Sequence, residues 1–571
     1  MTSTRPARPW AAAYPPGVPA EVTAPLAPTL GQLVRDTAAR EGTRIAYTVV
    51  MPNGMYGDLS FADVDRLSDA FAAYLRGPAG LQAGDRVALQ TPNSLTVPVV
   101  AFGVFKAGCV LVNINPLYTP AEMAHQLRDA SPKLIVITDM FTDKLAEAGK
   151  LTPLPQVIVT RVAEFMPRAV RGVIGLVQKH WDRIIPQITL PHTRLPDALA
   201  QGATQPSARY DSDLPPDAIA ALQYTGGTTG VAKGAILTHR NLLMNMAQAM
   251  TFIDPYVAPG REVVLTAIPT YHILAFTLNL LGFFHLGGRN LLIPNPRPLS
   301  NLKRAFENYP ITWIIGVNTL FNGLMNEFWF RDAPPRALKA SFAGGMALHG
   351  AVAQRWRDMT GTEIVEGYGL TETSPVATGN PIGGARPGSI GIPMPSTDVR
   401  LIDDAGAEVP PGTPGEFTLR GPQVMAGYWQ RPDDTAAVLD PDGFLRTGDI
   451  AIMDPDGYFR IVDRKKDMIL VSGFNVYPNE VEDILARHPG IAESAVIGIP
   501  DGAAGEAVRA YIVRRDPALT EAEVRAHCKA NLTAYKVPRH VEFRDDLPKS
   551  NVGKILRREL RTEALAEQKG A

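Results

Sequence analysis

Short apolar runs alternate with helix-like segments from residue 86 onward, and this alternation limits the fold more than any other feature of the sequence. The order is RVALQ, a helix-like stretch Ser94–Lys106, CVLVNIN, a helix-like stretch Pro120–Asp129, and KLIVIT. Strands that alternate with helices indicate a parallel sheet covered by helices on both faces. We therefore expect an α/β layer in this part of the chain.

A second series of apolar runs predicts a second α/β layer. VVLTAIP begins at Val263, NLLIP at Asn290, TWIIGV at Thr312 and SFAGG at Ser341, with helical or turn-rich segments between them. After Ser389 the pattern changes to short alternating runs separated by Gly, Pro and Asp turns. That change predicts a small antiparallel β unit.

The final block of the chain has the pattern of a separate domain. It opens at Asp463 with the charge-dense DRKKD and continues with a predicted helix near Pro478–Arg487. Predicted strands follow near Ala495–Ile499 and Arg509–Val513, and the block ends in a basic tail. We expect a small α+β unit here.

Length and composition support this division. At 571 residues the chain is too long for one compact core. We predict an α/β protein with a large N-terminal domain, residues 1–462, made of two α/β subdomains and a small β unit. A mobile, small α+β C-terminal domain follows, residues 463–571. A net charge of -1 and 45% hydrophobic residues argue against a disordered chain and against a nucleic-acid partner, so we expect small-molecule partners.

Cysteine usage and the N-terminus indicate a cytoplasmic protein. Cys109 and Cys528 are far apart and have no His or Cys neighbours at the spacing of metal ligands, so neither a disulfide framework nor a zinc site is expected. Met1–Thr23 lacks a continuous apolar core of signal-peptide length. The most apolar stretch, Ile273–Phe284, is well short of the roughly 20 residues of a membrane span, and we expect a buried helix.

Residues 168–185 have the pattern of an amphipathic helix. Apolar side chains share one face, and basic side chains lie elsewhere: Val170, Val173, Ile174, Val177, Trp181 and Ile184 against Arg168, Arg171, Lys179 and Arg183. Such a helix is compatible with peripheral contact at the inner face of a membrane. It is also compatible with packing on the protein itself, which is the commoner use of an amphipathic stripe, and Gly172 and Gly175 weaken the helix.

A glycine-rich stretch in mid-chain, YTGGTTGVAKG, predicts a phosphate-binding turn. It has three kinds of contributors: glycines that allow tight turns (Gly226, Gly227, Gly230), hydroxyl donors (Thr225, Thr228, Thr229) and the cation Lys233. A nucleoside triphosphate is the expected ligand, although a surface loop of small residues has a similar composition. The stretch is not a Walker A loop, because Ala232 precedes Lys233 and Gly234 follows it.

The stretch EGYGLTET offers further nucleotide contacts. Tyr368 presents a flat face for a purine, Thr371 a hydroxyl group and Glu372 a carboxylate. A carboxylate beside a triphosphate serves mainly as a Mg²⁺ ligand, since Mg²⁺ prefers oxygen donors and bridges phosphate oxygens. A helix start capped by Thr371 explains the same residues.

Three motifs nearer the C-terminus carry charged residues beside glycines. In RTGDI, Asp449 is placed to accept hydrogen bonds from both hydroxyls of a ribose. In DRKKDMILVSGFNVYPNEVE, Arg464 and Lys466 are within reach of a phosphate or ribose, and the backbone of Gly473 can pass close to a ligand. In LPKSNVGKILRREL, Lys554 follows a glycine turn. Taken singly, these motifs equally describe a hairpin turn, a charged linker and a solvated basic tail.

Together and in this order, the five motifs resemble the adenylate-forming superfamily of acyl-CoA synthetases, nonribosomal-peptide adenylation domains and luciferases. The similarity runs from about Phe61 to Leu560. The narrower match is to bacterial long-chain fatty-acid–CoA ligases, which NPLYTP, LQYTGGTTGVAKGA, GVNTLFNGL, GPQVMAGYWQRP and the last two motifs resemble. The resemblance implies that a fatty carboxylate attacks ATP, pyrophosphate leaves, and the acyl-adenylate then reacts with coenzyme A.

The resemblance also implies roles for the nucleotide-binding residues. Phosphate contacts would come from Thr225, Gly226, Gly227, Thr228, Thr229, Gly230 and Lys233, and the adenine wall from Gly344, Gly345, Glu366, Gly367 and Tyr368, with Thr371 nearby. Asp449 would hold the ribose with help from Arg464, and Lys466 would add a further contact. Thr225 and Glu372 would hold Mg²⁺.

Four further residues take roles by the same resemblance. Lys554 would stabilise charge in the first step. His272 would lie between the nucleotide and acyl pockets, although a buried histidine with satisfied hydrogen bonds fits equally, and Phe276 would gate the acyl tunnel. Gly473 would line the path of coenzyme A, so that rotation about a hinge at Asp463 presents Lys554 and Gly473 in turn.

The resemblance leaves some alternatives open. An aryl- or medium-chain acyl-CoA ligase, or an enzyme that loads an acyl group onto a carrier protein, would keep the same motifs. This chain has Leu470 where some relatives have a lysine, so that position is not expected to act in the thiol step.

Overall fold

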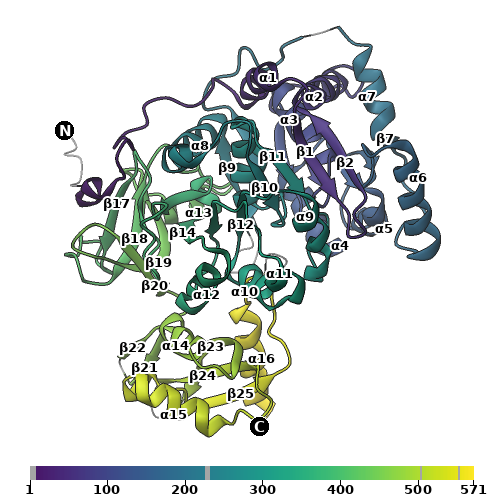
Figure 1. Cartoon of the computed structure of the whole chain (residues 1–571). Helices are drawn as coiled ribbons and strands as arrows, with labels where there is room; N and C mark the ends of the chain where they lie inside the picture. Colours follow the sequence, from purple (N-terminus) through teal and green to yellow (C-terminus); the bar gives the residue numbers. More distant parts are fainter. Residues whose placement is uncertain are drawn as a thin grey trace.

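The computed structural model describes residues 8–206, 208–225, 232–472, 474–501, 505–550 and 553–570. Figure 1 shows a large body that holds the N-terminal and central parts of the chain, with a smaller C-terminal unit below it. The α/β fold class, with two α/β subdomains, a small β unit and a small C-terminal unit, is confirmed.

The first predicted α/β layer is a seven-stranded sheet in the order β7-β6-β5-β3-β4-β8-β9. Its strands are β3 (Arg86–Gln90), β4 (Val110–Asn113), β5 (Leu134–Thr138), β6 (Gln156–Thr160), β7 (Thr193–Arg194), β8 (Ile219–Thr225) and β9 (Lys233–Thr238). All neighbours are parallel except β8 and β9, which form an antiparallel hairpin. The predicted glycine-rich turn therefore joins two strands.

The second layer is a nine-stranded sheet in the order β16-β15-β14-β13-β12-β10-β11-β1-β2. Its strands are β1 (Ile45–Val50), β2 (Tyr56–Ser60), β10 (Val263–Thr266), β11 (Arg289–Leu292), β12 (Trp313–Gly316), β13 (Ala340–Ala343), β14 (Ile364–Gly369), β15 (Val376–Gly379) and β16 (Ile392–Pro393). The four predicted runs are strands β10 to β13. The sequence did not reveal that β1 would pair with β11, more than 200 residues further along the chain, with Thr48 opposite Leu291.

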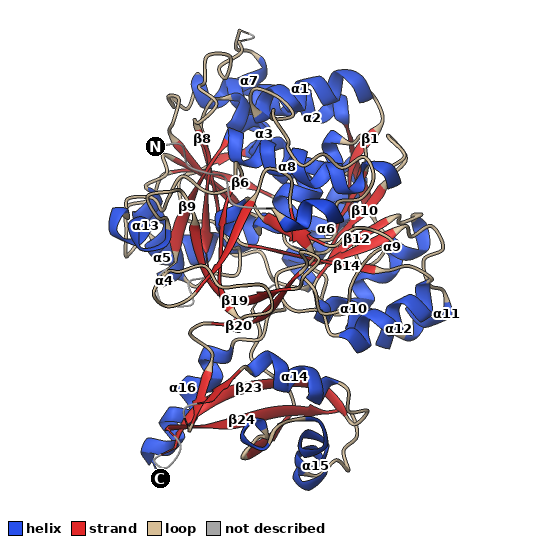
Figure 2. Cartoon of the chain, turned by 90° about the vertical axis from the view of Figure 1, so that its left-hand side faces the viewer, coloured by secondary structure: helices blue, strands red, loops and turns tan. Residues whose placement is uncertain are grey.

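The small β unit after Ser389 is confirmed as a four-stranded antiparallel sheet. It contains β17 (Asp398–Ile402), β18 (Gly415–Arg420), β19 (Leu445–Met453) and β20 (Phe459–Arg464). Figure 2 shows β19 and β20 at the base of the large body, directly above the C-terminal unit.

The C-terminal unit is a five-stranded sheet with helices. Its elements are β21 (Ile469–Val471), β22 (Phe474–Val476), α14 (Pro478–Ala486), β23 (Ile491–Asp501), β24 (Gly505–Arg514), α15 (Glu521–Asn531), η8 (Ala534–Lys536), β25 (His540–Arg544) and α16 (Arg557–Gly570). Its apolar core is separate from those of the large body.

Helices cover both large sheets. Those of the first half are η1 (Pro9–Ala13), α1 (Leu30–Glu41), α2 (Phe61–Arg76), α3 (Thr96–Lys106), α4 (Pro120–Ala130), η2 (Asp139–Phe141), α5 (Thr142–Ala148), α6 (Arg168–Leu176), η3 (Val177–Trp181), α7 (Leu195–Ala203), α8 (His239–Ile253) and η4 (Asp254–Tyr256). Those that follow are η5 (Ala275–Phe283), η6 (Leu299–Leu302), α9 (Lys303–Asn308), α10 (Asn318–Asn326), α11 (Phe328–Asp332), α12 (Gly350–Thr360), η7 (Thr371–Thr373) and α13 (Pro432–Val438).

Local sequence explains where several helices begin. Helices α2, α4 and α8 each start with a capping box. In this motif the side chain of the residue before the helix accepts a hydrogen bond from the backbone N–H three positions later, and the side chain at that later position accepts one from the backbone N–H of the first residue. Thr119, in the NPLYTP motif, and Glu122, two residues after it, form the box of α4. These ends are fixed by residues three apart.

The expected buried helix is confirmed, and it has π-helical hydrogen bonding over η5. Phe276 is fully buried there, and Thr277 donates a hydrogen bond to the carbonyl of Ser374 at 2.8 Å. The π-form is unusual in a segment this long and is often found at functional sites. Among the residues with assigned structure, no helix is both long and apolar enough to cross a membrane.

Candidate active site

The predicted phosphate-binding turn lies between two described residues. Thr225 ends β8, Lys233 begins β9, and the two are direct partners in the hairpin. Residues 226–231 lie outside the described part of the chain, so Gly226, Gly227, Thr228, Thr229 and Gly230 are not placed. The hairpin brings Thr225 and Lys233 side by side at the mouth of the turn.

The predicted adenine wall comes together at the carboxyl ends of β13 and β14. Gly344 and Gly345 directly follow β13, and Gly345 has a φ of +81°, which favours glycine. A Cβ on Gly344 would lie 3.6 Å from the carbonyl oxygen of Gly367. The carboxyl ends of parallel strands are where open α/β sheets bind ligands.

Glu366 on β14 is a buried carboxyl group. Its Oε1 accepts a hydrogen bond from the backbone N–H of Leu348 at 3.1 Å. Its Oε2 has no hydrogen-bond partner among the described residues. Burial raises the pKa of Glu366 to about 8, so this side chain is mainly protonated at neutral pH.

Tyr368, Asp449 and Arg464 form a connected group. The Tyr368 hydroxyl donates to Asp449 Oδ2 at 2.6 Å, and Arg464 Nε lies 3.0 Å from Asp449 Oδ1. Asp449 and Arg464 are also register partners on β19 and β20. Burial, reinforced by Asp449, raises the pKa of Tyr368 well above its usual value, so the hydroxyl stays a donor. The sheet therefore orients the predicted ribose-binding carboxylate.

Lys554 lies in the same charged environment, although it belongs to the C-terminal unit. Burial, with a further contribution from the Arg464 guanidinium, lowers the pKa of Lys554 to about 8. Burial and then Lys554 lower the pKa of the half-buried His272 to about 4. Lys554 is therefore close to both predicted partners, on the nucleotide side and on the acyl side.

The loop that carries Lys554 is held by local and interdomain contacts. The backbone N–H of Ser550 donates to the Lys554 carbonyl at 2.7 Å, and its hydroxyl accepts from the Lys554 N–H at 3.1 Å. Thr319 on α10 donates to the carbonyl of Gly553 at 3.5 Å. Gly553 has a φ of +86°, and a Cβ there would lie 2.6 Å from the Thr319 hydroxyl. Glycine at 553 thus allows the loop to dock.

Glu372 has a partner that sequence reasoning missed. The hydroxyl of Tyr428 donates to Glu372 Oε1 at 2.6 Å, and the backbone N–H of Met425 donates to the Glu372 carbonyl at 2.8 Å. Tyr428 lies in GPQVMAGYWQRP, which contributed to the resemblance without an assigned role. No local pattern identifies the contact, because the two residues are 56 positions apart.

The donor set fits a magnesium ion held mainly by substrate. Among the described residues, Tyr428 bonds to Oε1 of Glu372 and no hydrogen bond is made to its Oε2, and the Thr225 hydroxyl is a second hard oxygen donor. No group of three or more His, Cys, Asp or Glu side chains suited to a metal occurs among the described residues. Mg²⁺ at nucleotide sites commonly takes one or two protein ligands and several phosphate oxygens.

The remaining predicted residues are placed as follows. Thr371 begins η7, one position before Glu372. Lys466 lies in the turn after β20, where burial lowers its pKa. Phe276 packs near Phe105, with ring centroids 6.2 Å apart. Gly473 lies outside the described residues.

The predicted hinge residue Asp463 is buried in a network between the two units. Its carboxylate accepts from the backbone N–H of Asn479 at 2.8 Å and from Arg557 Nη1 at 3.3 Å. Burial raises the pKa of Asp463 to about 6, and the nearby Arg557 opposes this shift. Arg557 also pairs with Glu482 at 2.6 Å. The start of α16 is thereby tied to the end of β20.

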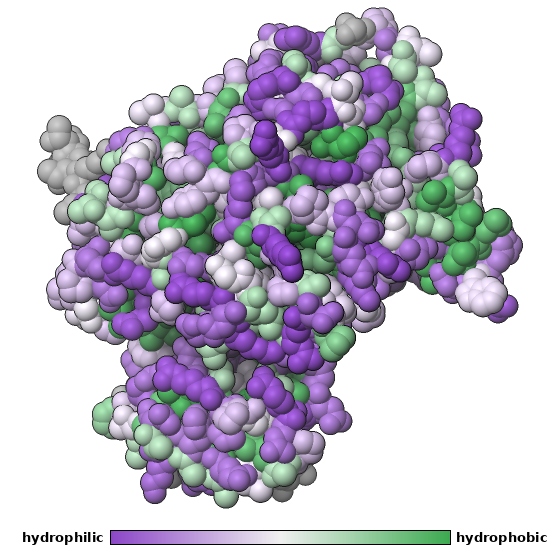
Figure 3. All heavy atoms as spheres, in the orientation of Figure 1, coloured by the Kyte–Doolittle hydropathy of each residue, from purple (hydrophilic) through white to green (hydrophobic). Residues whose placement is uncertain are grey.

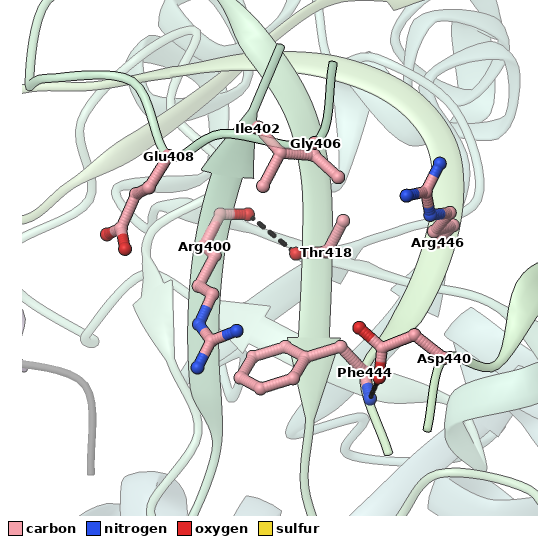
Figure 4. A pocket seen from close by; sticks show the side chains of 8 residues that line it. All are labelled: Arg400, Ile402, Gly406, Glu408, Thr418, Asp440, Phe444 and Arg446. Carbon is pink, nitrogen blue, oxygen red and sulfur yellow. Dashed lines mark hydrogen bonds between the residues drawn. The ribbon is translucent and has the colours of Figure 1, made fainter. Parts of the chain in front are cut away.

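A cavity of about 150 Å³ on the β17–β19 face lies apart from these groups. Figure 4 shows its lining, with Arg400 beside the ring of Phe444 and Arg446 on the opposite side. Arg446 belongs to RTGDI, but none of the predicted ligand-binding residues lines the cavity. It is therefore not the candidate active site.

Comparison with known proteins shows the family of the chain. Residues 34–429 match the family described as AMP-binding enzyme, and residues 480–554 match the AMP-binding enzyme C-terminal domain. A long-chain-fatty-acid–CoA ligase of Yersinia pestis is 50% identical, and one of Escherichia coli O6:H1 is 48% identical, each over 97% of this chain and 98% of the relative. The crystal structure of ATP-bound MatB from Rhodopseudomonas palustris superposes with a TM-score of 0.80 at 29% identity, over 93% of this chain and 98% of that one. The chain belongs to the AMP-binding enzyme family.

Proposed function

We propose that the protein is a long-chain-fatty-acid–CoA ligase that forms AMP. A carboxylate oxygen of the fatty acid attacks the α-phosphorus of ATP, the bond to the bridging oxygen breaks, and pyrophosphate leaves. The sulfur of coenzyme A then attacks the acyl carbonyl, its proton is lost, and AMP leaves. Relatives that carry this name at 48% and 50% identity over nearly the whole chain support the proposal.

The placement of Lys554 is the observation that carries the first step. This lysine comes from the C-terminal unit yet lies in the charged environment of Arg464 and Asp449, and its charge also lowers the pKa of His272. With a pKa of about 8 it is mainly a cation at neutral pH. Negative charge grows between the attacking carboxylate and the α-phosphate, and a buried cation that is already in place stabilises it without reorganisation.

The large body positions the nucleotide in this proposal. Asp449 holds the ribose hydroxyls, the carboxyl ends of β13 and β14 hold the adenine, and the hairpin from Thr225 to Lys233 holds the β- and γ-phosphates. Thr225 and Glu372 would hold Mg²⁺, which neutralises phosphate charge when bound. His272 and Phe276 separate the nucleotide from the acyl chain.

The second step requires a different placement of the C-terminal unit. We propose that the unit, residues 463–571, turns about Asp463 and brings Gly473 beside the path of coenzyme A. On either side of this position, Val471 at the end of β21 and Phe474 at the start of β22 are register partners. The network of Asp463 with Asn479 and Arg557 would keep the pivot ordered while the unit turns.

A pyrophosphate-release assay across acids from acetate to oleate, with and without coenzyme A, tests the function. We expect pyrophosphate and AMP with long-chain acids, and acyl-CoA only when coenzyme A is added. Preference for coumarate over myristate would favour an aryl-CoA ligase, and a maximum at shorter acids a medium-chain ligase. Transfer to a pantetheinyl protein in place of coenzyme A would indicate a carrier-loading enzyme. Release of ADP and phosphate would contradict the proposal.

We also propose cytoplasmic localisation with peripheral membrane contact through residues 168–185. In α6, Ile174 is buried and packs on the main core, whereas Leu176 is 63% exposed and Trp181 in η3 is 87% exposed. The segment is therefore held on the protein through Ile174, and its apolar side chains Leu176 and Trp181 face solvent. Figure 3 shows apolar atoms at the right-hand edge of the molecule, where Figure 1 places α6. Basic residues beside such a surface favour anionic lipids.

Vesicle binding tests this surface. We expect the protein to sediment with vesicles that contain anionic lipid, more than with phosphatidylcholine alone, because basic residues flank the apolar side chains. The double variant Leu176→Ser with Trp181→Ser should lose most of this binding. Phe328→Ser is the matched control, since Phe328 is 74% exposed elsewhere on the body. Equal loss in both variants, or no binding by the unmodified protein, would contradict the contact.

A further inference from the structure

Lys233, the predicted phosphate ligand, already has an acidic partner. Its Nζ donates to Asp434 Oδ1 at 2.5 Å, across 201 positions of sequence. The two side chains keep 26% and 36% of their surface exposed, so the pair lies at the edge of the site and is open to exchange. Sequence reasoning assigned no role to Asp434.

The same ammonium group also faces an aromatic ring. Lys233 Nζ lies 5.4 Å from the ring centroid of Tyr428, within the range of a cation–π contact. The hydroxyl of that ring donates to Glu372, the predicted magnesium ligand. Lys233, Asp434, Tyr428 and Glu372 therefore form one chain of contacts.

Backbone contacts hold this arrangement independently of the ion pair. The segment from Ala426 to Trp429 runs beside β9, with Ala426 N–H donating to the Ile236 carbonyl at 3.0 Å and Trp429 N–H donating to the Gly234 carbonyl at 2.8 Å. Thr435, the residue after Asp434, accepts the Tyr428 N–H through its hydroxyl at 2.9 Å. Asp434 is thus placed beside Lys233 by the fold, and removing its charge should leave the backbone in place.

We infer that the Asp434 carboxylate pairs with the Lys233 ammonium in place of a nucleotide phosphate. When ATP binds, its β- or γ-phosphate replaces this carboxylate as the partner of Lys233. The inference rests on the proposed function, which takes Lys233 as a phosphate ligand. The carboxylate balances the cation while the site is empty, and it competes with each phosphate that arrives. Its presence weakens the binding of ATP and pyrophosphate, and leaves AMP, which lacks those phosphates, unaffected.

Isothermal titration calorimetry of ATP and AMP, without acid substrate, tests the exchange. We expect Asp434→Asn to bind ATP about two- to fivefold more tightly, the range of a partly exposed ion pair, with no change for AMP. Asp433→Asn is the matched control, because Asp433 is the exposed neighbour on α13 and its loss changes the net charge equally. Lys233→Met should weaken ATP binding, and adding Asp434→Asn to it should have no further effect.

The outcomes separate the inference from the proposed function. Unchanged or weaker ATP binding by Asp434→Asn, an equal gain in Asp433→Asn, or an equal gain for AMP would overturn the role of Asp434 alone. A gain that persists in the Lys233→Met background would also overturn it. Failure of the unmodified protein and of every variant to bind ATP would contradict the proposed function, and the inference with it.

Discussion

At the scale of single residues, the site depends on ionisable side chains whose burial changes their proton affinity. Lys554 is the clearest case, because burial and a nearby guanidinium bring its pKa down to about 8. A lysine with its usual pKa would be insensitive to pH in the physiological range. This one loses charge within it.

Replacing Lys554 with Ala should impair one half-reaction selectively. We expect pyrophosphate exchange to fall by about 10²- to 10³-fold, the size reported for removal of one transition-state donor. Transfer from supplied acyl-adenylate to coenzyme A should persist. Both half-reactions can be measured separately, and an equal loss in both would contradict the role of Lys554.

The pH dependence of the first half-reaction should follow the same lysine. Because the cation is the active form, the rate of adenylation should decrease as pH rises through about 8. In Lys554→Arg the side chain stays charged, so any remaining activity should show no decrease in that range. If the adenylation rate of the Arg variant decreased at the same pH, the decrease would belong to another titrating group.

Glu366 makes a different prediction, about stability. Its pKa is 4.5 in model compounds and about 8 in the folded protein, so the folded state binds this proton more strongly. Its contribution to stability is therefore fully present below about 4.5 and is lost as pH rises to 8. In Glu366→Gln the side chain has no proton to lose, so this pH-dependent loss of stability is absent. From pH 5 to pH 8.5, the free energy of unfolding of the variant should therefore rise by roughly 2–4 kcal/mol relative to that of the unmodified protein.

Denaturant unfolding at several pH values measures this difference. Glu408→Gln serves as the control, since Glu408 lies exposed on the surface. A difference for Glu366→Gln that stays constant with pH would show that the carboxyl group is not held in its protonated form.

At the scale of elements, short antiparallel strand pairs flank the turns that are predicted to bind substrates. Strands β8 and β9 flank the predicted phosphate-binding turn, and β21 and β22 flank the position of Gly473. Ser472, the residue before Gly473, has a φ of +50°, which only a tight turn imposes on a serine. Gly473 itself lies outside the described residues, and its place beside the path of coenzyme A is a prediction.

Gly473→Leu should therefore have the opposite effect to Lys554→Ala. We expect pyrophosphate exchange to persist and the transfer of the acyl group to coenzyme A to fall at least tenfold, because a leucine fills the path of the thiol arm. The measurement is acyl-CoA formation from supplied acyl-adenylate. Unimpaired transfer would remove Gly473 from that path.

At the scale of the whole molecule, two polar contacts between described residues join the units away from the network at Asp463. His349 Nδ1, at the start of α12, lies 2.9 Å from Asp483 Oδ1 on α14. Thr319 and Gly553 make the second contact described above. Weak contacts of this kind suit a unit that must leave one orientation for another.

Loss of the contact between His349 and Asp483 should shift the equilibrium between the two proposed orientations of the C-terminal unit. Exposed pairs contribute about 0.2–1 kcal/mol, so Asp483→Asn should slow pyrophosphate exchange by about two- to fivefold. The thiol step should be unchanged or faster, since it uses another orientation. A double-mutant cycle with His349→Ala measures the coupling, and additive effects would show that the pair does not hold the unit.

The sequence alone determined the layers and the chemistry class. Period-two and helical patterns are local, so the apolar runs of both α/β layers and the β unit after Ser389 appeared as strands where expected. The ordered motifs indicated the enzyme family, which the comparisons show, and the roles of single residues in them remain predictions. The capping box at Thr119 is likewise set by residues that are close in sequence.

Only the tertiary structure decided which distant residues meet. The pairing of β1 with β11, the hydrogen bond from Tyr428 to Glu372 and the ion pair of Lys233 with Asp434 join segments from 56 to more than 200 positions apart. The pKa values of Lys554 and Glu366 likewise depend on burial beneath several elements. Patterns along a chain record which face of an element is apolar, whereas contacts and desolvation arise only when the elements have packed.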